Sequence, residues 1–359
     1  MTVDQQRLLV FAGSYAEPED SGVYVYAFDE DKGILSLTDE YAGLKNPTFL
    51  NVDADRGILY SIGETVNSEG HKVGEAAVFA IDSAKGTISL IQRELTVDST
   101  TCHIQRDANS RYLTVTSYHG GMIGLLSLLE DGKIGKVLDI QQHVKSSEHR
   151  DRPHPHSSFF SPDERFLLIS DLGLDRIVTY SIDKANNKLM RHGEIALHSG
   201  AGPRHLTFHP NGKFVYAINE LDSTITAFDY DAETGLLAIK ETVSTLPADF
   251  NGDNGCAEIA ISADGKYVYG SNRGHDSIVV FAVEEQSGLL SIVQHISVQG
   301  GHPRHFALTP SGRYLLAANR DTNNIVIFNV NQENGKLNNS GNSVTVSKPV
   351  CVIPVYLTT

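Results

Sequence analysis

The chain is built from short runs in which apolar and polar residues alternate, separated by turns rich in Gly, Asn and Asp. Residues 204–231 show the unit: "RHLTFH" is followed by the turn "PNGK" and by the alternating runs "FVYAIN" and "TITAFDYD". Period-two alternation bounded by such turns predicts β-strands. The Asn-Gly pair supplies the positive φ values that a tight turn needs. A Gly hairpin and the run "LLAIKETV" add a fourth strand, and helical periodicity is nearly absent.

The same unit recurs along the chain. Its turn and following strand are found in "DADRGILYSIGE", "RDANSRYLTVTSY", "FSPDERFLLISDL", "HPNGKFVYAINE", "SADGKYVYGSNR" and "TPSGRYLLAANR". The spacings are 54, 54, 48, 53 and 47 residues when the equivalent turn positions are Asp55, Asn109, Asp163, Asn211, Asp264 and Ser311. Four antiparallel strands repeated at this period are typical of a β-propeller, in which radial repetition leaves few exposed sheet edges.

The two ends of the chain supply one further unit. "VFAGSYA" resembles a second strand that lacks its first, and "PVCVIPV" resembles a first strand that lacks its second. We therefore predict an all-β fold with one domain over residues 1–359. It is a seven-bladed β-propeller of four-stranded antiparallel blades, closed by pairing of the N- and C-terminal strands. The absence of Trp excludes the WD-type repeat signature.

Composition narrows the class of protein. A hydrophobic content of 40% over 359 residues indicates a globular chain. The net charge of −15 argues against nucleic acid or an anionic membrane as the main partner. The N-terminal segment lacks a signal pattern, and no apolar run approaches the ~20 residues of a membrane span, so we expect a cytoplasmic protein. The three cysteines lie far apart without Cys-x-x-Cys spacing, which argues against a disulfide framework and a thiolate zinc site.

Two columns of equivalent positions carry the candidate chemistry. Seven residues before each turn position stand Thr48, Cys102, His156, Arg204, Ala257 and Arg304. Nine residues after it stand Glu64, Tyr118, Leu172, Glu220, Arg273 and Arg320. Because the first strand runs toward the turn and the second runs back, both columns emerge on one face of the ring. The innermost strands line the central channel, so we predict that the columns meet at one concave mouth.

The columns place four arginines in a protein of charge −15: Arg204, Arg273, Arg304 and Arg320. Guanidinium forks suit bidentate binding of carboxylate or phosphate, so the predicted partner is a small anionic substrate. Singly, each residue is also compatible with an ordinary ion pair between blades, worth about 0–1 kcal/mol when exposed. Their coincidence on one face favours a binding site. The sequence carries no signal for the oligomeric state, and it leaves open whether the Gly- and Asn-rich loops 65–75 and 246–256 cover the mouth.

Histidines gather in two places. The segment "QQHVKSSEHRDRPHPHSS" contains His143, His149, His154 and His156, but its spacing matches no metal motif, so no metal site is predicted. One place after the first column stand His103, His205 and His305, which we expect to face the other side of their strands. Packing or hydrogen bonds between blades is their expected role. No Gly-rich phosphate loop or G-x-S-x-G motif occurs, so Ser-His-Asp chemistry has no support from the sequence.

Four segments carry a family resemblance: "HPHSSFFSPD", "GAGPRHLTFHPNGKFVYAINEL", "ISADGKYVYGSNRGHDSIVVF" and "GGHPRHFALTPSGRYLLAANRDTNNIVIF". Over essentially the whole chain they resemble the lactonase family of seven-bladed propellers, which contains cycloisomerase-type 6-phosphogluconolactonase and fungal carboxy-cis,cis-muconate cyclase. The joint motifs G-P-R-H, N-E-L and S-N-R-G are specific to the family and less specific between its members. The resemblance implies a catalytic site made of His156, Arg204, Glu220 and Arg273. The columns add Arg304 and Arg320 as further substrate-binding residues.

The resemblance implies hydrolysis of 6-phospho-D-glucono-1,5-lactone to 6-phosphogluconate in the pentose phosphate pathway, without a metal or organic cofactor. A lactone is an activated ester, so the enzyme must position water, accept its proton and stabilise an oxyanion. His156 is the candidate base because imidazole titrates near neutrality. Glu220 either orients that imidazole or is itself the base. Arg204 and Arg273 would divide phosphate binding and oxyanion stabilisation between them.

Two other functions fit the same residues. One is closure of a muconolactone ring on a dicarboxylate, which would use the arginines equally well. The other is a noncatalytic propeller that binds a ligand or protein at its mouth, with Tyr15 and Tyr118 as aromatic anchors.

Overall fold

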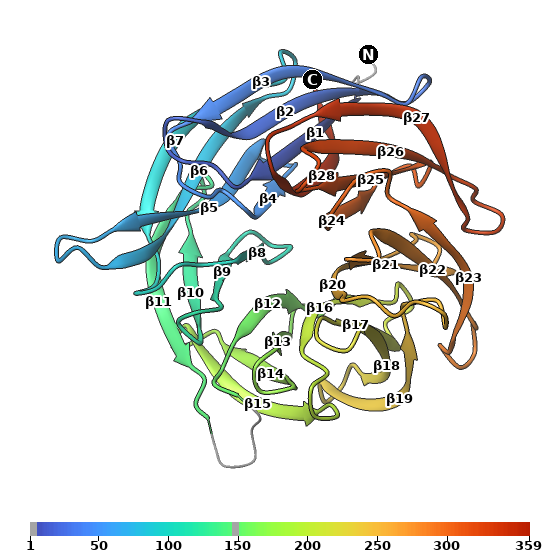
Figure 1. Cartoon of the computed structure of the whole chain (residues 1–359). Coiled ribbons are helices and arrows are strands. Elements are labelled where there is room, and N and C mark those ends of the chain that lie inside the picture. Colours follow the sequence, from blue (N-terminus) through green and yellow to red (C-terminus); the bar gives the residue numbers. More distant parts are fainter. Residues whose placement is uncertain (1–5, 146–150) are drawn as a thin grey trace, which may run out of the picture.

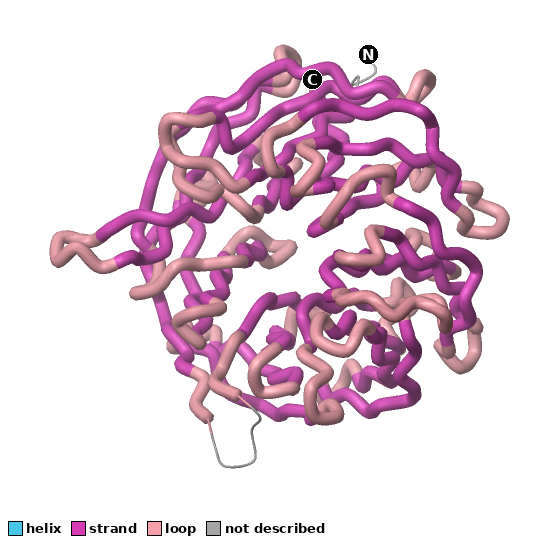
Figure 2. The backbone as a smooth tube through the Cα atoms, in the orientation of Figure 1, coloured by secondary structure: helices cyan, strands magenta, loops and turns pink. Residues whose placement is uncertain are grey.

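The computed structural model describes residues 6–145 and 151–359, which form seven four-stranded antiparallel sheets around a central channel (Figure 1). Within these ranges the regular structure consists of strands joined by loops (Figure 2). The predicted seven-bladed all-β propeller is therefore confirmed. No helix in the described part of the chain is long and apolar enough to cross a membrane.

Each blade is given from its innermost to its outermost strand. The first four blades are β28 (Pro349–Thr358), β1 (Gln6–Ser14), β2 (Ser21–Asp29), β3 (Ile34–Ala42); β4 (Leu50–Asp53), β5 (Ile58–Val66), β6 (Lys72–Asp82), β7 (Thr87–Leu95); β8 (His103–Arg106), β9 (Tyr112–Ser117), β10 (Met122–Leu128), β11 (Ile134–Gln142); and β12 (Pro155–Phe160), β13 (Phe166–Asp171), β14 (Arg176–Asp183), β15 (Lys188–Ala196). The other three are β16 (Pro203–Phe208), β17 (Phe214–Asn219), β18 (Thr224–Asp231), β19 (Leu236–Ser244); β20 (Gly255–Ile261), β21 (Tyr267–Arg273), β22 (Ser277–Val283), β23 (Leu290–Ser297); and β24 (Pro303–Leu308), β25 (Tyr314–Asn319), β26 (Asn324–Val330), β27 (Leu337–Thr345).

The ring closes through the chain ends. β1 pairs antiparallel with β28 from Gln6 opposite Thr358 to Gly13 opposite Cys351. The C-terminal strand is thus the innermost strand of the blade that contains β1, β2 and β3. This confirms the predicted closure, and β1 and β28 lie side by side in Figure 1.

The hydrophobic core lies between neighbouring blades. The second strand of a blade has a sheet face toward each neighbour, so all six residues of β17 are buried. Phe214 and Tyr216 of β17 pack in one cluster with Val268 and Phe281 of the next blade. The outermost strand β19 instead alternates between exposed and half-buried positions. Packing between neighbouring blades therefore holds the inner strands in place around the channel.

Buried tyrosines tie three of the blades to the blade that follows. The hydroxyl of Tyr216 donates to the carbonyl of Gly288 at 2.9 Å, across the blade boundary. The same bond recurs from Tyr60 to Gly132 at 2.7 Å and from Tyr269 to Gly335 at 3.0 Å. A side chain of the second strand therefore anchors the hairpin turn of the following blade.

Tyr216→Phe is expected to lower the free energy of unfolding by about 1–2 kcal/mol, because it leaves the Gly288 carbonyl unpaired in a buried site. Urea denaturation measures the change. Tyr267→Phe is the control, since the Tyr267 hydroxyl bonds the Glu333 carbonyl at 2.8 Å in an exposed position, and a change within about 0.5 kcal/mol is expected. Equal midpoints for Tyr216→Phe and the wild type would contradict the anchoring role.

Candidate functional site

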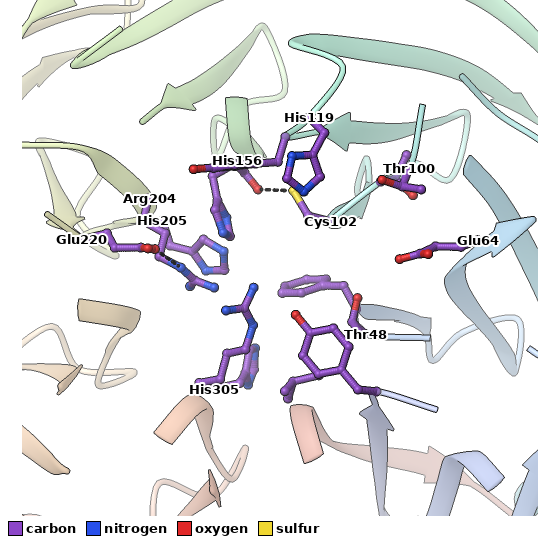
Figure 3. Close-up of a pocket in the computed structure, with 16 residues that line it drawn as sticks. Thr48, Glu64, Thr100, Cys102, His119, His156, Arg204, His205, Glu220 and His305 are labelled. Carbon is purple, nitrogen blue, oxygen red and sulfur yellow. Dashed lines mark hydrogen bonds and ion pairs between the residues drawn. The ribbon is translucent and has the colours of Figure 1, made fainter. Parts of the chain in front are cut away.

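One mouth of the channel contains a cavity of about 320 Å³ (Figure 3). Its wall comes from six of the seven blades and combines cationic, acidic, hydroxyl and aromatic side chains. Eight positions of the two sequence columns line it: Thr48, Glu64, Cys102, Tyr118, His156, Arg204, Glu220 and Arg304. The structure therefore brings most of the two columns together, as the antiparallel geometry of the first and second strands requires.

A β-bulge at the start of three inner strands sets the direction of the key side chains. In β16, Pro203 pairs with Asn219, but His205 pairs with Ile218, so Arg204 is an extra residue. The same slip occurs at His156 in β12 and at Arg304 in β24. A bulge re-aims side chains and allows two consecutive residues to face one side.

The bulge overturns one expectation about the inner strands. His205 and His305 were expected to face away from the mouth, yet both line the cavity beside Arg204 and Arg304. The expected hydrogen bonds between blades are nevertheless present, because His205 of β16 bonds a residue of β20. Strict two-residue alternation fails here because the strand contains one extra residue on the channel side.

Glu220 lies between two guanidiniums. Its Oε2 is 3.1 Å from Nε of Arg204 and 2.9 Å from Nη2 of Arg273. The Arg204 contact is electrostatic, because its buried Nε–H does not point at the oxygen with hydrogen-bond geometry. Burial raises the pKa of Glu220, but Arg273, Arg204 and Arg304 outweigh it and leave that pKa below 4.5. Glu220 is therefore an anion that holds Arg204 in position. Because its pKa is low, it is a weak proton acceptor.

Arg204 has the most buried guanidinium of the site, with 3% of its side chain exposed. Its Nη1 donates to the carbonyl of Ala257 at 2.5 Å. Burial, with Arg304 and Arg273 nearby, lowers the pKa of Arg204 to about 9, so the side chain is still charged at neutral pH. Fixed by Glu220 and Ala257, it presents a pre-oriented cation to the cavity.

Arg273 and Arg320 do not line the cavity. Arg273 lies behind Glu220 and donates from Nε to the carbonyl of Gly255 and from Nη2 to that of Cys256, at 3.0 and 2.6 Å. Arg320 bonds Asp321 at 2.6 Å. The predicted direct contact of these two arginines with a substrate therefore gains no support from the geometry, and Arg273 acts through Glu220.

Arg304 supplies a second guanidinium group to the cavity wall. It is half-buried, and its guanidinium carbon lies 5.9 Å from the ring centroid of Tyr15. Among residues 6–145 and 151–359 it has no ion-pair or hydrogen-bond partner for its guanidinium group. Its donors are consequently available to an anion that enters the cavity.

His156 lines the cavity as a buried imidazole. Burial, followed by the charge of Arg204, holds its pKa well below 6.5. Burial and Arg204 therefore favour the neutral form of this imidazole rather than a titration near neutrality. Its Nδ1 has no partner, and no hydrogen bond joins it to Glu220 among the described residues. Glu220 thus does not orient this imidazole.

The wall opposite Arg204 is acidic and hydroxylic. Glu64 reaches into the cavity from the far side, and Thr48 and Thr100 lie near it (Figure 3). Oε1 of Glu64 accepts a hydrogen bond from Nδ2 of Asn46 at 3.0 Å. One end of the cavity is therefore cationic, and the other offers a carboxylate and hydroxyl groups.

Sequence reasoning missed Phe49 and Glu258 and assigned to the histidines beside them packing or hydrogen bonds between blades, but no place in the cavity wall. The signal was present six residues before each turn position, where the chain has Phe49, His103, Ser157, His205, Glu258 and His305. Phe49 lines the floor of the cavity, with its ring centroid 5.8 Å from that of His205 and 5.6 Å from that of His305. This third column therefore contributes Phe49, His205 and His305 to the cavity wall.

Two histidines of the histidine-rich segment make hydrogen bonds within the protein. His143 bonds Asp171 at 2.6 Å and the hydroxyl of Tyr180 at 3.0 Å, and His154 bonds the carbonyl of Tyr118 at 2.9 Å. His149 lies outside the described residues. In the part of the chain that the structure describes, no three His, Cys, Asp or Glu side chains are grouped to hold a metal ion.

The two Gly- and Asn-rich loops contribute no residue to the cavity wall. Residues 67–71 form the turn between β5 and β6, which projects outward from the ring in Figure 1. Residues 245–254 connect β19 to β20. The open question about these loops is therefore answered for this structure: neither covers the mouth.

Comparison with known proteins places the chain in a family. The model of the family described as "Lactonase, 7-bladed beta-propeller" matches residues 9–354. The chain belongs to this lactonase family. It is 32% identical to the 6-phosphogluconolactonase of Bacillus subtilis over 344 residues, which cover 95% of this chain and 97% of that protein. A 6-phosphogluconolactonase of Formosa agariphila is 33% identical over 309 residues, 83% of this chain and 86% of that protein.

A solved structure of a relative has the same architecture. The periplasmic gluconolactonase of Pseudomonas aeruginosa superposes with a TM-score of 0.89 at 29% identity, over 97% of this chain and 99% of that one. The predicted resemblance and the prediction of a lactonase-family enzyme are thus confirmed. Because this lactonase-family relative is periplasmic, the cytoplasmic location stays a prediction.

Proposed function

We propose that this lactonase-family protein hydrolyses 6-phospho-D-glucono-1,5-lactone to 6-phosphogluconate in the cytoplasm, as a step of the pentose phosphate pathway. The observation that carries the proposal is the pair Arg204 and Arg304, which face one cavity beside neutral imidazoles. A small lactone with one anionic end matches this distribution of charge. The names of the Bacillus and Formosa relatives support the choice of substrate.

The chemistry requires no covalent intermediate. Water attacks the lactone carbonyl carbon, the C=O electron pair moves onto oxygen, and collapse of the tetrahedral intermediate breaks the bond to the ring oxygen. Arg204, fixed by Glu220 and Ala257, would stabilise the oxyanion, while Arg304 would bind the phosphate. His156, neutral and buried at the wall, would accept a hydrogen bond from substrate or water. Arg273 would keep Glu220, and through it Arg204, in place.

Glu64 favours a sugar lactone over the dicarboxylate of a muconolactone-forming enzyme. Its carboxylate lies on the wall opposite Arg204, where it would accept hydrogen bonds from sugar hydroxyls. A second carboxylate of a substrate at that wall would meet a like charge, which disfavours binding.

A coupled assay tests the proposal. Purified protein is added to freshly prepared 6-phosphogluconolactone, and 6-phosphogluconate is detected by NADP reduction with its dehydrogenase, after correction for spontaneous hydrolysis. Glucono-1,5-lactone and a muconolactone serve as comparison substrates. We expect the highest kcat/KM for the phosphorylated lactone. A rate at the spontaneous level for both sugar lactones would reject the proposal.

Arg304→Ala is expected to raise KM for 6-phosphogluconolactone about tenfold to a hundredfold with little change in kcat, because the variant loses a charge-assisted contact of about 1.5–3 kcal/mol to the phosphate. The KM for glucono-1,5-lactone, which lacks the phosphate, should change less than threefold. Steady-state kinetics with both lactones measure the difference. An equal rise of KM for the two substrates would show that Arg304 does not bind the phosphate.

A further inference from the structure

Two histidines that line the cavity, His205 and His305, share one buried carboxylate. Glu258 of β20 is buried, with 8% of its side chain exposed. Nδ1 of His205 lies 3.1 Å from its Oε1 and 3.0 Å from its Oε2. Nε2 of His305 lies 3.2 Å from the same Oε2. Glu258 thus joins the inner strands β16 and β24 on either side of its own.

The hydrogen bond to Glu258 fixes the tautomer of His205. A carboxylate accepts hydrogen bonds, so Nδ1 of His205 carries the proton. In the neutral ring Nε2 then holds a lone pair. His205 is 1% exposed, its ring points from β16 toward the centre of the cavity in Figure 3, and its Nε2 has no hydrogen-bond partner among the described residues.

The other histidine on this carboxylate has no free nitrogen. Nδ1 of His305 accepts the backbone N–H of Val352 at 3.4 Å, so its proton is on Nε2, which faces Glu258. His156 offers a nitrogen to the cavity as well, but no carboxylate holds its ring. His205 is therefore the imidazole of the cavity wall that combines a buried, unpartnered Nε2 lone pair with an orienting carboxylate, the arrangement of a general base.

We propose that His205, positioned by Glu258, is the general base of the lactone hydrolysis. The inference rests on the proposed function. As the water oxygen bonds to the carbonyl carbon, its proton passes to Nε2 of His205. When the bond to the ring oxygen breaks, the imidazolium returns this proton to the ring oxygen, which becomes a hydroxyl group. Glu258 stabilises the imidazolium formed between the two steps.

The charges around His205 suit a base that gains strength when substrate binds. The titratable and charged groups around it are Glu258, Arg204, Arg304, His103, His156 and His305, with Arg273 behind Glu220. Burial first, then the three arginines, lower the pKa of His205 well below 6.5, so the free enzyme holds the ring neutral. An anion bound to Arg204 and Arg304 offsets their charge and raises the basicity of His205 in the complex.

The test uses His205→Gln and Glu258→Gln in the full chain, assayed with 6-phosphogluconolactone and glucono-1,5-lactone. His205→Gln should lower kcat about 10²–10⁴-fold with KM within threefold, because the anion is held elsewhere. Its remaining rate should rise in proportion to hydroxide concentration, since no base is left to activate water. Glu258→Gln should lower kcat at least tenfold and change the pH profile.

His209→Asn is the matched control. His209 is also buried, follows β16 directly, and bonds the carbonyl of Gly265 and the N–H of Asn211, away from the cavity. This variant is expected to lose stability and to keep the wild-type kcat and pH profile. Circular dichroism establishes that all three variants are folded.

Nitrogen NMR of labelled protein tests the pairing without turnover. The wild type should show the Nδ1–H tautomer of His205, and Glu258→Gln should change it. A wild-type kcat for folded His205→Gln in an active enzyme, or an Nε2–H tautomer in the wild type, would overturn this inference alone. A wild type inactive on both sugar lactones would reject the proposed function and the base role together.

Discussion

Arg204→Ala is expected to lower kcat/KM for 6-phosphogluconolactone about 10²–10³-fold, or about 2.7–4 kcal/mol of transition-state stabilisation. The guanidinium is already held by Glu220 and by the carbonyl of Ala257, so little reorganisation is needed when negative charge develops on the lactone oxygen. The loss should fall mainly on kcat, because Arg304 still binds the phosphate. Steady-state kinetics with both sugar lactones measure it, and the two substrates should lose kcat to a similar extent.

Arg106→Ala is the control for this experiment. Arg106 also lies on an inner strand and is largely buried, but it bonds Ser110 at 2.6 Å and lies 3.7 Å from Asp53, away from the cavity. This variant should lose stability and keep its kcat/KM. An Arg204→Ala enzyme within threefold of the wild-type kcat/KM would remove Arg204 from the catalytic site.

Glu220→Gln is expected to destabilise the fold by about 2–4 kcal/mol at neutral pH. Removing one partner of a buried ion pair leaves the other charge uncompensated, which costs about 3–5 kcal/mol when burial is complete. A quarter of the Glu220 side chain is exposed, so the expected cost is smaller. Here two guanidiniums, those of Arg204 and Arg273, lose their shared anion. Urea denaturation at pH 7 measures the change.

The loss of unfolding free energy in Glu220→Gln is expected to decrease at acidic pH. The pKa of Glu220 is lowered in the folded protein, so its ion pairs stabilise the fold above about 4.5, the ordinary value of the carboxyl. As pH falls below that value toward the folded pKa, the contribution disappears. The gap in unfolding free energy between the wild type and Glu220→Gln should therefore shrink on acidification.

Glu194→Gln provides a matched control, because Glu194 also pairs with two arginines, Arg176 and Arg191, but away from the cavity. A change below about 1 kcal/mol and full activity are expected there. If Glu220→Gln and Glu194→Gln were equally stable, the ion pairs of Glu220 would not contribute the predicted ~2–4 kcal/mol to the free energy of unfolding.

The fold and the site's location were predictable because both follow from repetition. Equivalent turns define the blades, and antiparallel strands bring Arg204 and Glu220 to one face wherever the ring closes. The facing of His205 was not predictable in this way, because the bulge that turns it depends on a hydrogen-bond register formed only in the sheet.

The roles of individual charges also depend on the folded environment. Arg273 occupies the same kind of position as Glu220, yet its guanidinium turns to the carbonyls of Gly255 and Cys256. The depressed pKa of His156 results from burial and from Arg204, neither of which its sequence neighbours reveal. Residue type and spacing therefore indicate which groups gather at the mouth, and packing decides which of them face the substrate.

A crystal structure of the protein with 6-phosphogluconate bound is the most direct test of the cavity as the site of lactone hydrolysis. We predict that the phosphate lies within hydrogen-bond distance of Arg304 and that the carboxylate formed from the lactone carbonyl lies beside Arg204 and Nε2 of His205. Product bound outside the cavity, or inside it without contact to either arginine, would contradict this account.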